Sequence, residues 1–374
     1  MTTYIRYGKK WELSLDSKLN YLDIELTERC NNACIHCCIN LPVNDQVAKK
    51  KEMPLKQIQD YLKQAADLGC LRVRFTGGEP LLRPDFKTIY EYTRRLGIRV
   101  VLFTNARLIT PRLAQLFASM PPLEKIEVTV YGMHEKSYDT NAGQPGAFRS
   151  FKRGVQLLLD YRIPFIVKSV ILPANRSELE EFEHWARTIP WMEHNPGYSI
   201  FFELRNRRDD PQKNHMIESL RPSPEEGVRL MLDHHPEEFE HFSHQACPSR
   251  QVIHGDRLFL CGASDRQLTI DAYGQIQACL GLRMPELVLP IGTPLQEALD
   301  HFEQLKEMRS TNSDYLNRCA QCILRNLCEN CPAKAWSESG TLDTPLQYYC
   351  DVTHTLARQL GWLEQGELGW KTKD

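Results

Sequence analysis

The segment Thr27-Glu-Arg-Cys30-Asn-Asn-Ala-Cys34-Ile-His-Cys37 places three cysteines at CxxxCxxC spacing directly after a strand-like stretch, Tyr21–Leu26. In β/α folds, the loop at the carboxyl end of a strand is where active sites are built. Three thiolates at this spacing can bind three corners of a cubane iron–sulfur cluster, because such clusters prefer thiolate ligands. The fourth iron would then stay open to another ligand. A zinc site with Cys38 or His36 as the fourth ligand is the alternative.

Strand-like and helix-like segments alternate from residue 21 to residue 205. The strand candidates are Tyr21–Leu26, Leu71–Phe75, Arg99–Thr104, Ile126–Tyr131, Phe165–Leu172 and Tyr198–Arg205. Helical patterns lie between them; for example, apolar positions recur from Leu55 to Ala66 after Pro54. Six strands with intervening helices predict an α/β fold of parallel β/α units, arranged as an open or partial (β/α)6 barrel.

The predicted strands have one apolar and one polar face. In the fourth, Ile126, Val128 and Val130 share one side, while Glu127, Thr129 and Tyr131 share the other. The same alternation assigns to the polar faces the residues Arg72, Arg74, Glu203 and Arg205. A closed eight-stranded barrel is filled with branched apolar side chains. A polar inner face therefore predicts a wider, solvated lumen that binds a ligand, unless these residues are simply exposed at edge strands.

The second motif is the tetrapeptide Gly77-Gly78-Glu79-Pro80, just past the second predicted strand. Two glycines let the backbone approach a ligand closely. Backbone carbonyls and the Glu79 carboxylate can accept hydrogen bonds from an ammonium group. Alone, this tetrapeptide indicates only a turn, but one β/α unit after the CxxxCxxC loop it becomes specific.

With both motifs in this order, residues 20–205 resemble the radical S-adenosylmethionine (SAM) superfamily. The resemblance implies that Cys30, Cys34 and Cys37 hold a [4Fe–4S] cluster whose open iron binds SAM. Reductive cleavage of SAM then gives a 5′-deoxyadenosyl radical, which abstracts a substrate hydrogen. In the family the residue before the third cysteine is usually aromatic, and here it is His36.

The same resemblance implies that Gly77–Pro80 hold the methionyl amine of SAM. Positions at strand ends and in the fifth strand suit ribose or carboxylate contacts, with strand capping or packing as the alternative for each. These further candidates are Thr104, Asn105, Thr129, Tyr131, Lys168 and Ser169. No catalytic residue is assigned.

Eight of the 13 cysteines lie between residues 247 and 350. Two CxxC pairs could form a zinc ribbon, but seven or eight thiols fit two four-ligand clusters better than one zinc. The stretch Ile270–Gln277 predicts a hairpin with Gly274 at its turn, which would bring Cys261 and Cys279 together.

This region resembles the SPASM domain, which follows the barrel in many radical SAM enzymes that modify peptides and proteins. The resemblance implies two auxiliary [4Fe–4S] clusters and therefore three in the chain. The implied ligand sets are Cys261, Cys279 and Cys331, with Cys247 as a possible fourth, and Cys319, Cys322, Cys328 and Cys350. If Cys247 is not a ligand, one auxiliary iron is open to substrate. In the family, three residues usually separate the last two cysteines of this run, whereas two residues separate Cys328 and Cys331 here.

Net charge and the distribution of apolar residues along the chain indicate where the protein is located in the cell and how it is divided into domains. A net charge of −2 gives no argument for nucleic acid or an anionic membrane as a partner. The chain shows neither a bilayer-length apolar run nor a signal-peptide core, so we expect a cytoplasmic enzyme. We expect an N-terminal extension over residues 1–20, a radical SAM barrel over 21–205, a bridge over 206–246 and a SPASM domain with a C-terminal helix over 247–374.

The predicted reaction is oxidative modification, such as cross-linking, of a ribosomally made peptide or protein. Auxiliary clusters suit a net oxidation because they can accept the electron that a substrate radical must lose. A haem-pathway decarboxylase acting on tetrapyrrole propionates and an anaerobic sulfatase-maturating enzyme are the alternatives. The second is disfavoured because Leu280 stands where that family has a catalytic Asp. The expected electron donor is an external protein of flavodoxin or ferredoxin type. If a leader peptide is bound, we expect a separate leader-binding protein or the barrel rim to bind it, since few residues precede the first strand.

Overall fold

The computed structural model describes residues 4–6, 9–11, 17–234, 255–261, 263 and 266–371. The chain forms two compact units. The first comprises Met1–Ser199, Gly262–Leu280 and Pro285–Glu303, and the second comprises Ile200–Cys261, Gly281–Met284 and Gln304–Asp374.

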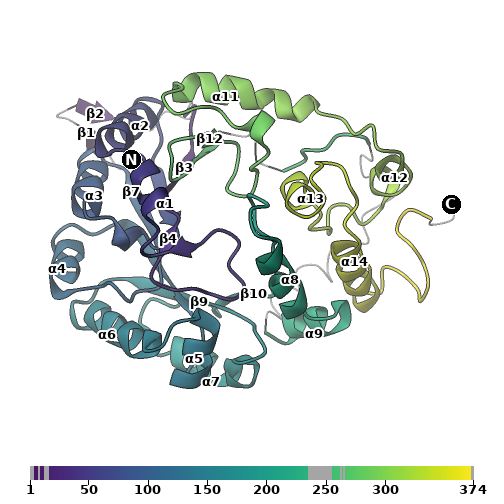
Figure 1. The fold of residues 1–374 in the computed structure, drawn as a ribbon, viewed down its shortest axis with the longest axis horizontal. Helices are drawn as coiled ribbons and strands as arrows, with labels where there is room; N and C mark the ends of the chain where they lie inside the picture. Colours follow the sequence, from purple (N-terminus) through teal and green to yellow (C-terminus); the bar gives the residue numbers. More distant parts are fainter. Residues whose placement is uncertain are drawn as a thin grey trace. The chain divides into compact units, whose positions relative to one another are not determined.

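The first unit is built on a mostly parallel sheet of eight strands in the order β10-β9-β8-β7-β6-β3-β11-β12 (Figure 1). Its strands are β3 (Tyr21–Thr27), β6 (Arg72–Gly77), β7 (Arg99–Thr104), β8 (Leu123–Val130), β9 (Phe165–Val170), β10 (Gly197–Ser199), β11 (Gln267–Ile270) and β12 (Ile276–Gln277). Short strand pairs are formed by β1 (Tyr4–Arg6) with β2 (Lys9–Trp11), and by β4 (Arg29–Cys30) with β5 (Leu41–Pro42).

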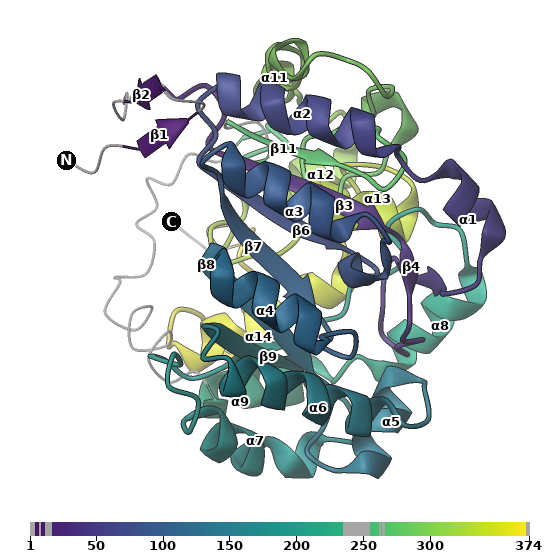
Figure 2. The same cartoon turned by 90° about the vertical axis from the view of Figure 1, so that its left-hand side faces the viewer.

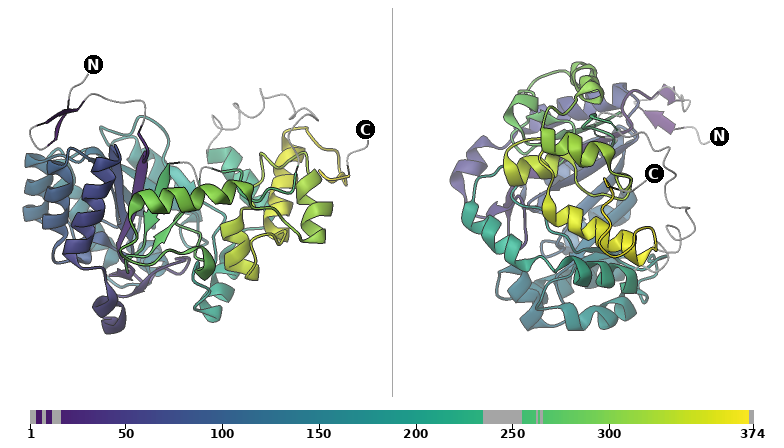
Figure 3. Two further views of the ribbon diagram at one scale, coloured as in Figure 1. Left: turned by 90° about the horizontal axis from the view of Figure 1, so that it is seen from above. Right: turned by 90° about the vertical axis from the view of Figure 1, so that its right-hand side faces the viewer.

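Strands β3 and β6 to β10 lie side by side in chain order, and each pair is parallel. Right-handed crossovers between such neighbours place every connecting helix on the same face of the sheet. Figure 2 shows α2, α3, α4 and α6 covering that face, and the view from above in Figure 3 shows the blue helices on one side of the strands. This open arrangement of sequential β/α units confirms the predicted fold class.

Among the helices of the first unit, α2 matches the helical pattern predicted from Leu55 to Ala66. The helices of this unit are α1 (Gln46–Lys51), α2 (Leu55–Asp67), α3 (Phe86–Arg95), α4 (Pro111–Ser119), α5 (Glu135–Ala142), α6 (Ala147–Asp160), α7 (Leu179–Ala186) and α11 (Leu295–Glu303). The alternation of apolar residues along the strands accounts for the core beneath them. Ile126 and Val128 are fully buried, whereas Glu127 and Thr129 on the opposite face of β8 are partly exposed.

The predicted sixth strand is largely wrong. Only Gly197–Ser199 pairs with β9, and the chain leaves the sheet at Ile200 to enter the second unit. Glu203 and Arg205 therefore do not lie on the inner face of the sheet. The Arg205 guanidinium instead forms an ion pair with Asp209 at 2.8 Å, which stabilises the turn before α8.

The predicted hairpin is confirmed, but it extends the sheet of the first unit. β11 pairs in parallel with β3 and antiparallel with β12. Gly274 sits in the turn with φ of +85°, a conformation that glycine adopts without steric cost. The Tyr61 hydroxyl of α2 donates to the Gly274 carbonyl at 3.1 Å, which fixes the turn to the helical layer.

The second unit consists of short helices and connecting segments. Its helices are α8 (Pro211–Leu220), α9 (Pro224–His234), α12 (Ser313–Asn317), α13 (Pro332–Ser339) and α14 (Gln347–Gln359). Val228 of α9 packs against Val352 and Leu356 of α14 in one small core. An ion pair of 2.6 Å between Arg221 and Glu338 ties the end of α8 to α13. No helix in the described part of the chain is long and apolar enough to cross a membrane.

Candidate functional site

The three cysteines of the first motif lie on the loop that follows β3. The side chains of Cys30 and Cys34 are buried, with 9% and 4% of their surface exposed. Cys37 is half-buried, and its amide donates to the Cys34 carbonyl at 3.3 Å, closing a turn between the last two cysteines. None of the three forms a disulfide bond with another described cysteine. The loop therefore carries three thiols that can act as ligands.

The C-terminal end of α5 holds this loop in place. The amides of Ala33 and Ile35 donate to the carbonyls of Ala142 and Asn141 at 2.8 and 3.3 Å. Gly143 ends the helix in the left-handed conformation, and a Cβ there would lie 2.3 Å from the Ala33 carbonyl oxygen. Only glycine permits so close an approach between the helix end and the cysteine loop.

The glycines of the Gly77–Pro80 motif contact the same loop from the other side. The Gly78 and Glu79 amides donate to the carbonyls of Thr27 and Arg29 at 2.6 and 2.9 Å. A Cβ on Gly77 would lie 2.2 Å from the Thr27 oxygen, and one on Gly78 would lie 2.2 Å from the Arg29 oxygen. The two glycines are thus required by contact between the two motifs, a reason that the sequence pattern did not reveal.

Glu79 is fully buried and its carboxylate is occupied by protein donors. It accepts hydrogen bonds from the Leu81 amide at 3.1 Å, the Thr104 hydroxyl at 2.9 Å and the Asn105 amide at 2.9 Å. Burial raises the pKa of Glu79 to about 7, against the lowering effect of these hydrogen bonds. The carboxylate therefore fixes the carboxyl end of β7 beside the second motif.

Asn105 extends this chain of contacts to the cysteine loop. Its side-chain amide donates to Asn31 Oδ1 at 2.8 Å and lies 3.8 Å from Cys30 Sγ. The Arg107 guanidinium donates to the Asn31 carbonyl and to Asn32 Oδ1. Sequence reasoning did not single out Asn31, Asn32 and Arg107. Their positions in the sequence could have identified them, because Asn31 and Asn32 lie within the first motif and Arg107 lies just past the third predicted strand.

Two buried donors at this loop have no hydrogen-bond partner within the described residues. They are Asn32 Nδ2 and Arg107 Nε. A buried donor without an acceptor is costly, and both a cluster sulfide and a ligand carboxylate are acceptors. Together with the three cysteine thiols, these donors fit a [4Fe–4S] cluster carrying a ligand with a carboxylate, as SAM has.

The remaining residues predicted to contact SAM lie on β8 and β9 or just after them. Some have structural partners, and others lie beside the cysteine loop. The Ser169 hydroxyl donates to the Val130 carbonyl at 2.7 Å and so links the two strands. Thr129 is half-buried on the inner face of β8. The Tyr131 ring lies 5.9 Å from the ring of His36, centroid to centroid. Tyr131 is therefore beside the cysteine loop, whereas the Ser169 hydroxyl has a structural partner.

The charged residues on the inner face of the sheet form opposite pairs. The Arg74 guanidinium lies 2.5 Å from the Asp23 carboxylate, and the Lys168 ammonium lies 3.2 Å from Glu127. Both cations also lie over the Phe103 ring, at 4.9 and 3.3 Å from its centroid. Burial lowers the pKa of Lys168, against the opposing effect of Glu127. This face is polar, as predicted, but the charges of Arg74 and Lys168 are already paired.

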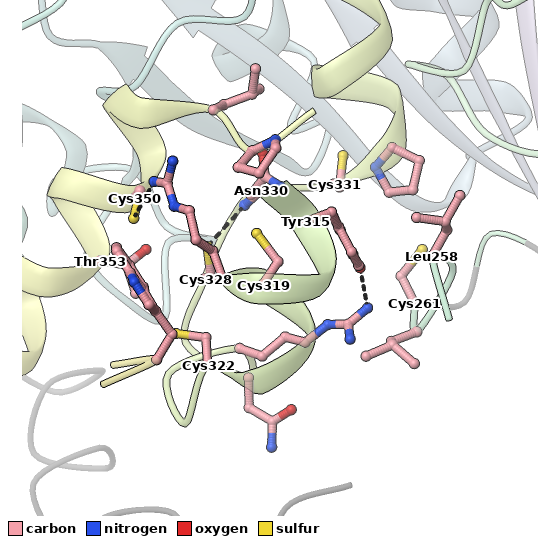
Figure 4. Close-up of a pocket in the computed structure, with 18 of the residues that line it drawn as sticks. Leu258, Cys261, Tyr315, Cys319, Cys322, Cys328, Asn330, Cys331, Cys350 and Thr353 are labelled. Atoms are coloured by element: carbon pink, nitrogen blue, oxygen red, sulfur yellow. Dashed lines mark hydrogen bonds between the residues drawn. The ribbon is translucent and has the colours of Figure 1, made fainter. Parts of the chain in front are cut away.

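A cavity of about 290 Å³ in the second unit gathers the downstream cysteines (Figure 4). Six line it, namely Cys261, Cys319, Cys322, Cys328, Cys331 and Cys350. In Figure 4, the side chains of Cys319, Cys322, Cys328 and Cys350 lie in one half of the view, and Cys261 and Cys331 lie in the other. The structure thus brings together the four cysteines predicted to form one ligand set.

Electrostatics support this grouping. Burial raises the pKa of Cys319 to about 12, and the neighbouring Cys328, Cys322 and Cys350 add to the rise. Burial likewise raises the pKa of Cys322 to about 11, with further contributions from Cys328 and Cys350. For Cys331, burial is again the main cause of the raised pKa, and the nearest charges belong to residues other than cysteine, such as Lys334. Four crowded thiols become thiolates readily only beside a cation such as iron.

The other predicted auxiliary ligands are divided between the two units. Cys279 follows β12 in the first unit, whereas Cys261 and Cys331 belong to the second. Cys247 lies outside the described residues. Among the residues that are described, no three His, Cys, Asp or Glu side chains surround a single point as ligands of one metal ion would. Cysteines that hold a cubane bind different iron atoms and need no such arrangement.

A family profile described as "Radical SAM superfamily" matches residues 24–186. The chain is 24% identical over 338 residues to an AdoMet-dependent heme synthase of Methanosarcina barkeri, covering 84% of this chain and 92% of that protein. It is 25% identical over 357 residues to the mycofactocin maturase MftC of Mycolicibacterium smegmatis, covering 91% of this chain and 84% of MftC.

Solved structures share the fold at low identity. The protein described as native anSMEcpe with bound AdoMet superposes with a TM-score of 0.61 and 16% identity, covering 90% of this chain and 96% of the other. Streptococcus suis SuiB, bound to precursor peptide SuiA, gives a TM-score of 0.59 and 16% identity over 87% of this chain and 74% of SuiB.

Three independent observations agree on the family. The cysteine loop and the Gly77–Pro80 motif lie in contact at the carboxyl ends of the first two barrel strands. The sheet has the predicted sequential β/α order. The family profile matches the same part of the chain. The chain is therefore an enzyme with a radical SAM domain over residues 24–186, followed by a cysteine-rich C-terminal region.

Proposed function

We propose that Cys30, Cys34 and Cys37 hold the [4Fe–4S] cluster that the family implies, with SAM bound beside it. When bound, the cluster and SAM supply a 5′-deoxyadenosyl radical. The chain's own residues position these groups. Asn105 and Arg107 present donors toward the cysteine loop, and Glu79 fixes the strand end that carries them. Backbone acceptors of Gly77–Pro80 are proposed to bind the methionyl amine.

We propose that the remaining predicted contacts have unequal roles. Thr129 and Tyr131 face the ligand side of the sheet and suit contacts with the ribose or adenine. The Ser169 hydroxyl and the Thr104 hydroxyl already bond to protein acceptors, so they position strands. Lys168 is held between Glu127 and Phe103 and belongs to the surface that faces the substrate.

We propose that the enzyme oxidatively modifies a ribosomally made peptide or protein. The observation that carries this proposal is the neutralised inner face of the sheet. Arg74 and Lys168 are each paired with a carboxylate, so neither is available to bind the propionates of a tetrapyrrole without losing that partner. A face of paired charges and one aromatic ring suits a peptide, which offers neutral backbone donors and acceptors as well as side chains.

The cysteines of the second unit support a net oxidation. Cys319, Cys322, Cys328 and Cys350 line one cavity, and four cysteines are the number that a [4Fe–4S] cluster binds. We propose that they hold one auxiliary [4Fe–4S] cluster. Cys261, Cys279 and Cys331, with Cys247 as a possible fourth ligand, are proposed to hold the other. An electron donor of ferredoxin or flavodoxin type and a separate leader-binding protein remain the proposed partners.

Haem-type decarboxylation is the second candidate, and a specific observation favours it. An AdoMet-dependent heme synthase aligns over 84% of this chain. The Arg72 guanidinium, which lies 4.4 Å from the Tyr21 ring centroid, is the cation of the predicted basic lumen that would remain for a propionate.

One experiment, in which each candidate substrate is offered in turn, distinguishes the two reactions. Reconstituted holoenzyme is incubated with SAM, dithionite and either a small precursor peptide identified by a search of the neighbouring genes or an iron porphyrin that bears propionates. We expect 5′-deoxyadenosine together with a peptide that has lost hydrogen, detected by mass spectrometry. Loss of carbon dioxide from the porphyrin, with an unchanged peptide, would assign the enzyme to the second candidate.

A further inference from the structure

The cavity of the second unit contains an arginine in contact with one of its cysteines. We propose that Arg318 is a positioning residue that raises the reduction potential of the cluster held by Cys319, Cys322, Cys328 and Cys350. This inference rests on the proposed function, which places an auxiliary cluster at these cysteines.

The Arg318 side chain is fixed from several directions. Its guanidinium donates to Cys350 Sγ at 3.7 Å, a contact marked by the dashed line at Cys350 in Figure 4, and to Gln347 Oε1 at 2.9 Å. It also pairs with Asp314 at 3.3 Å, and its Cζ lies 4.8 Å from the Trp370 ring centroid. Because all of these contacts come from one unit, the guanidinium is pre-organised at the wall of the cavity.

Arg318 also retains an unused donor. Its Nε is buried and has no partner among the described residues, although the residue lines the cavity. Leaving such a donor without an acceptor is costly. A sulfide or thiolate of a cluster is an acceptor that would satisfy it. The orphaned donor is thus a second observation, independent of the contact with Cys350, that points to an electron-rich group beside Arg318.

His354 supplies a second donor to the same cysteine. The Gly369 amide donates to His354 Nε2 at 3.0 Å, so this nitrogen carries the lone pair and the proton of the neutral ring is on Nδ1. Nδ1 lies 2.7 Å from the Cys350 carbonyl and 3.6 Å from Cys350 Sγ. Its N–H is therefore shared between that carbonyl and the sulfur.

These contacts have a definite electrostatic consequence. Hydrogen bonds to a ligand sulfur and a nearby positive charge both stabilise the more negative, reduced form of an iron–sulfur centre. Cys350 receives a charged donor and a neutral one. An electron that enters this cavity adds one negative charge next to the Arg318 guanidinium. The cluster proposed here should therefore accept an electron more readily than the same four cysteines would without Arg318.

The test is a potentiometric titration of the full-length holoenzyme, followed by electron paramagnetic resonance. Signals that do not respond to added SAM report the auxiliary clusters. We expect Arg318→Met to lower the midpoint potential of one such signal by about 59 mV, which is a tenfold change in a one-electron equilibrium. Arg318→Lys, which keeps the charge, should give a smaller shift.

Arg229→Gln is the control, because it removes a positive charge from an exposed position on α9 that does not line the cavity. It should leave the potential unchanged. Unshifted SAM-insensitive signals in both Arg318 variants, with wild-type iron content, would overturn the inference. Loss of that cluster in every Arg318 variant would overturn it as well, because Arg318 would then retain the cluster rather than tune it. A wild-type enzyme with only about four irons would instead contradict the proposed function.

Discussion

At the scale of single residues, the site is organised by buried polar side chains that connect the motifs. Glu79 is the clearest case. The sequence predicted a carboxylate directed at a ligand ammonium, but the structure directs it at three protein donors, two of which lie at the end of β7. Asn105 then carries the connection to Cys30. Sequence spacing identified both residues, yet it could not show which partner each one selects, because that depends on neighbouring strands.

The buried Glu79 predicts a pH dependence of stability. Its pKa is raised from an ordinary value of 4.5 to about 7, so between these values the unfolded chain releases a proton that the folded chain keeps. The free energy of unfolding of cluster-free protein should therefore fall as pH rises from 4.5 to 7, by up to about 3 kcal/mol. Urea denaturation across this range measures it.

Glu79→Gln provides the comparison, since the amide does not titrate. The variant should lose this part of the pH dependence. It should also weaken the hold on Asn105, because an amide nitrogen would face one of the three donors. If the variant shows the same fall in stability between pH 4.5 and 7 as the wild type, Glu79 is not its source.

At the scale of elements, close backbone contacts join the two motifs. Strand bounds were largely predictable, and Arg99–Thr104 matches β7 residue for residue. Alternation also identified the buried face of β8 correctly. It failed at Tyr198–Arg205, where an alternating pattern continues after the chain has left the sheet. An alternating pattern indicates which side chains are buried, but it does not specify that a neighbouring strand is present to pair with.

Gly78→Ala should be strongly destabilising. The added Cβ would lie 2.2 Å from the Arg29 carbonyl oxygen, so the two motifs would have to move apart. We expect a loss of about 1–3 kcal/mol in the free energy of unfolding, measured by chemical denaturation, and a lower iron content after reconstitution. Gly197→Ala in β10 is the control, because its Cβ meets nothing within 4 Å. Equal effects of both changes would contradict the proposed contact between motifs.

At the scale of the whole molecule, the chain has two units that each carry cysteines. The sequence located both groups of cysteines and the fold of the first unit. It did not reveal that the hairpin over residues 267–277 extends the sheet beside β3. Strand pairing between segments so far apart in the chain leaves no local signal in the sequence.

Cys322→Ala should separate radical formation from product formation. Cys322 belongs to the four-cysteine half of the cavity, and the first cysteine loop lies in the other unit. We expect formation of 5′-deoxyadenosine to be partly retained while the modified substrate is lost. Chromatography of 5′-deoxyadenosine and mass spectrometry of the substrate measure the two. If both activities fall equally while the first cluster is retained, the auxiliary cysteines do more than accept an electron.

The most direct test of the central claim replaces Cys30, Cys34 and Cys37 together by alanine. Iron content and 5′-deoxyadenosine formation are then measured in the reconstituted variant and in the wild type. If these residues hold the radical-generating cluster, the variant should lose about four irons per chain and should no longer cleave SAM. Continued formation of 5′-deoxyadenosine by the triple variant would contradict the assignment of this loop as the radical site.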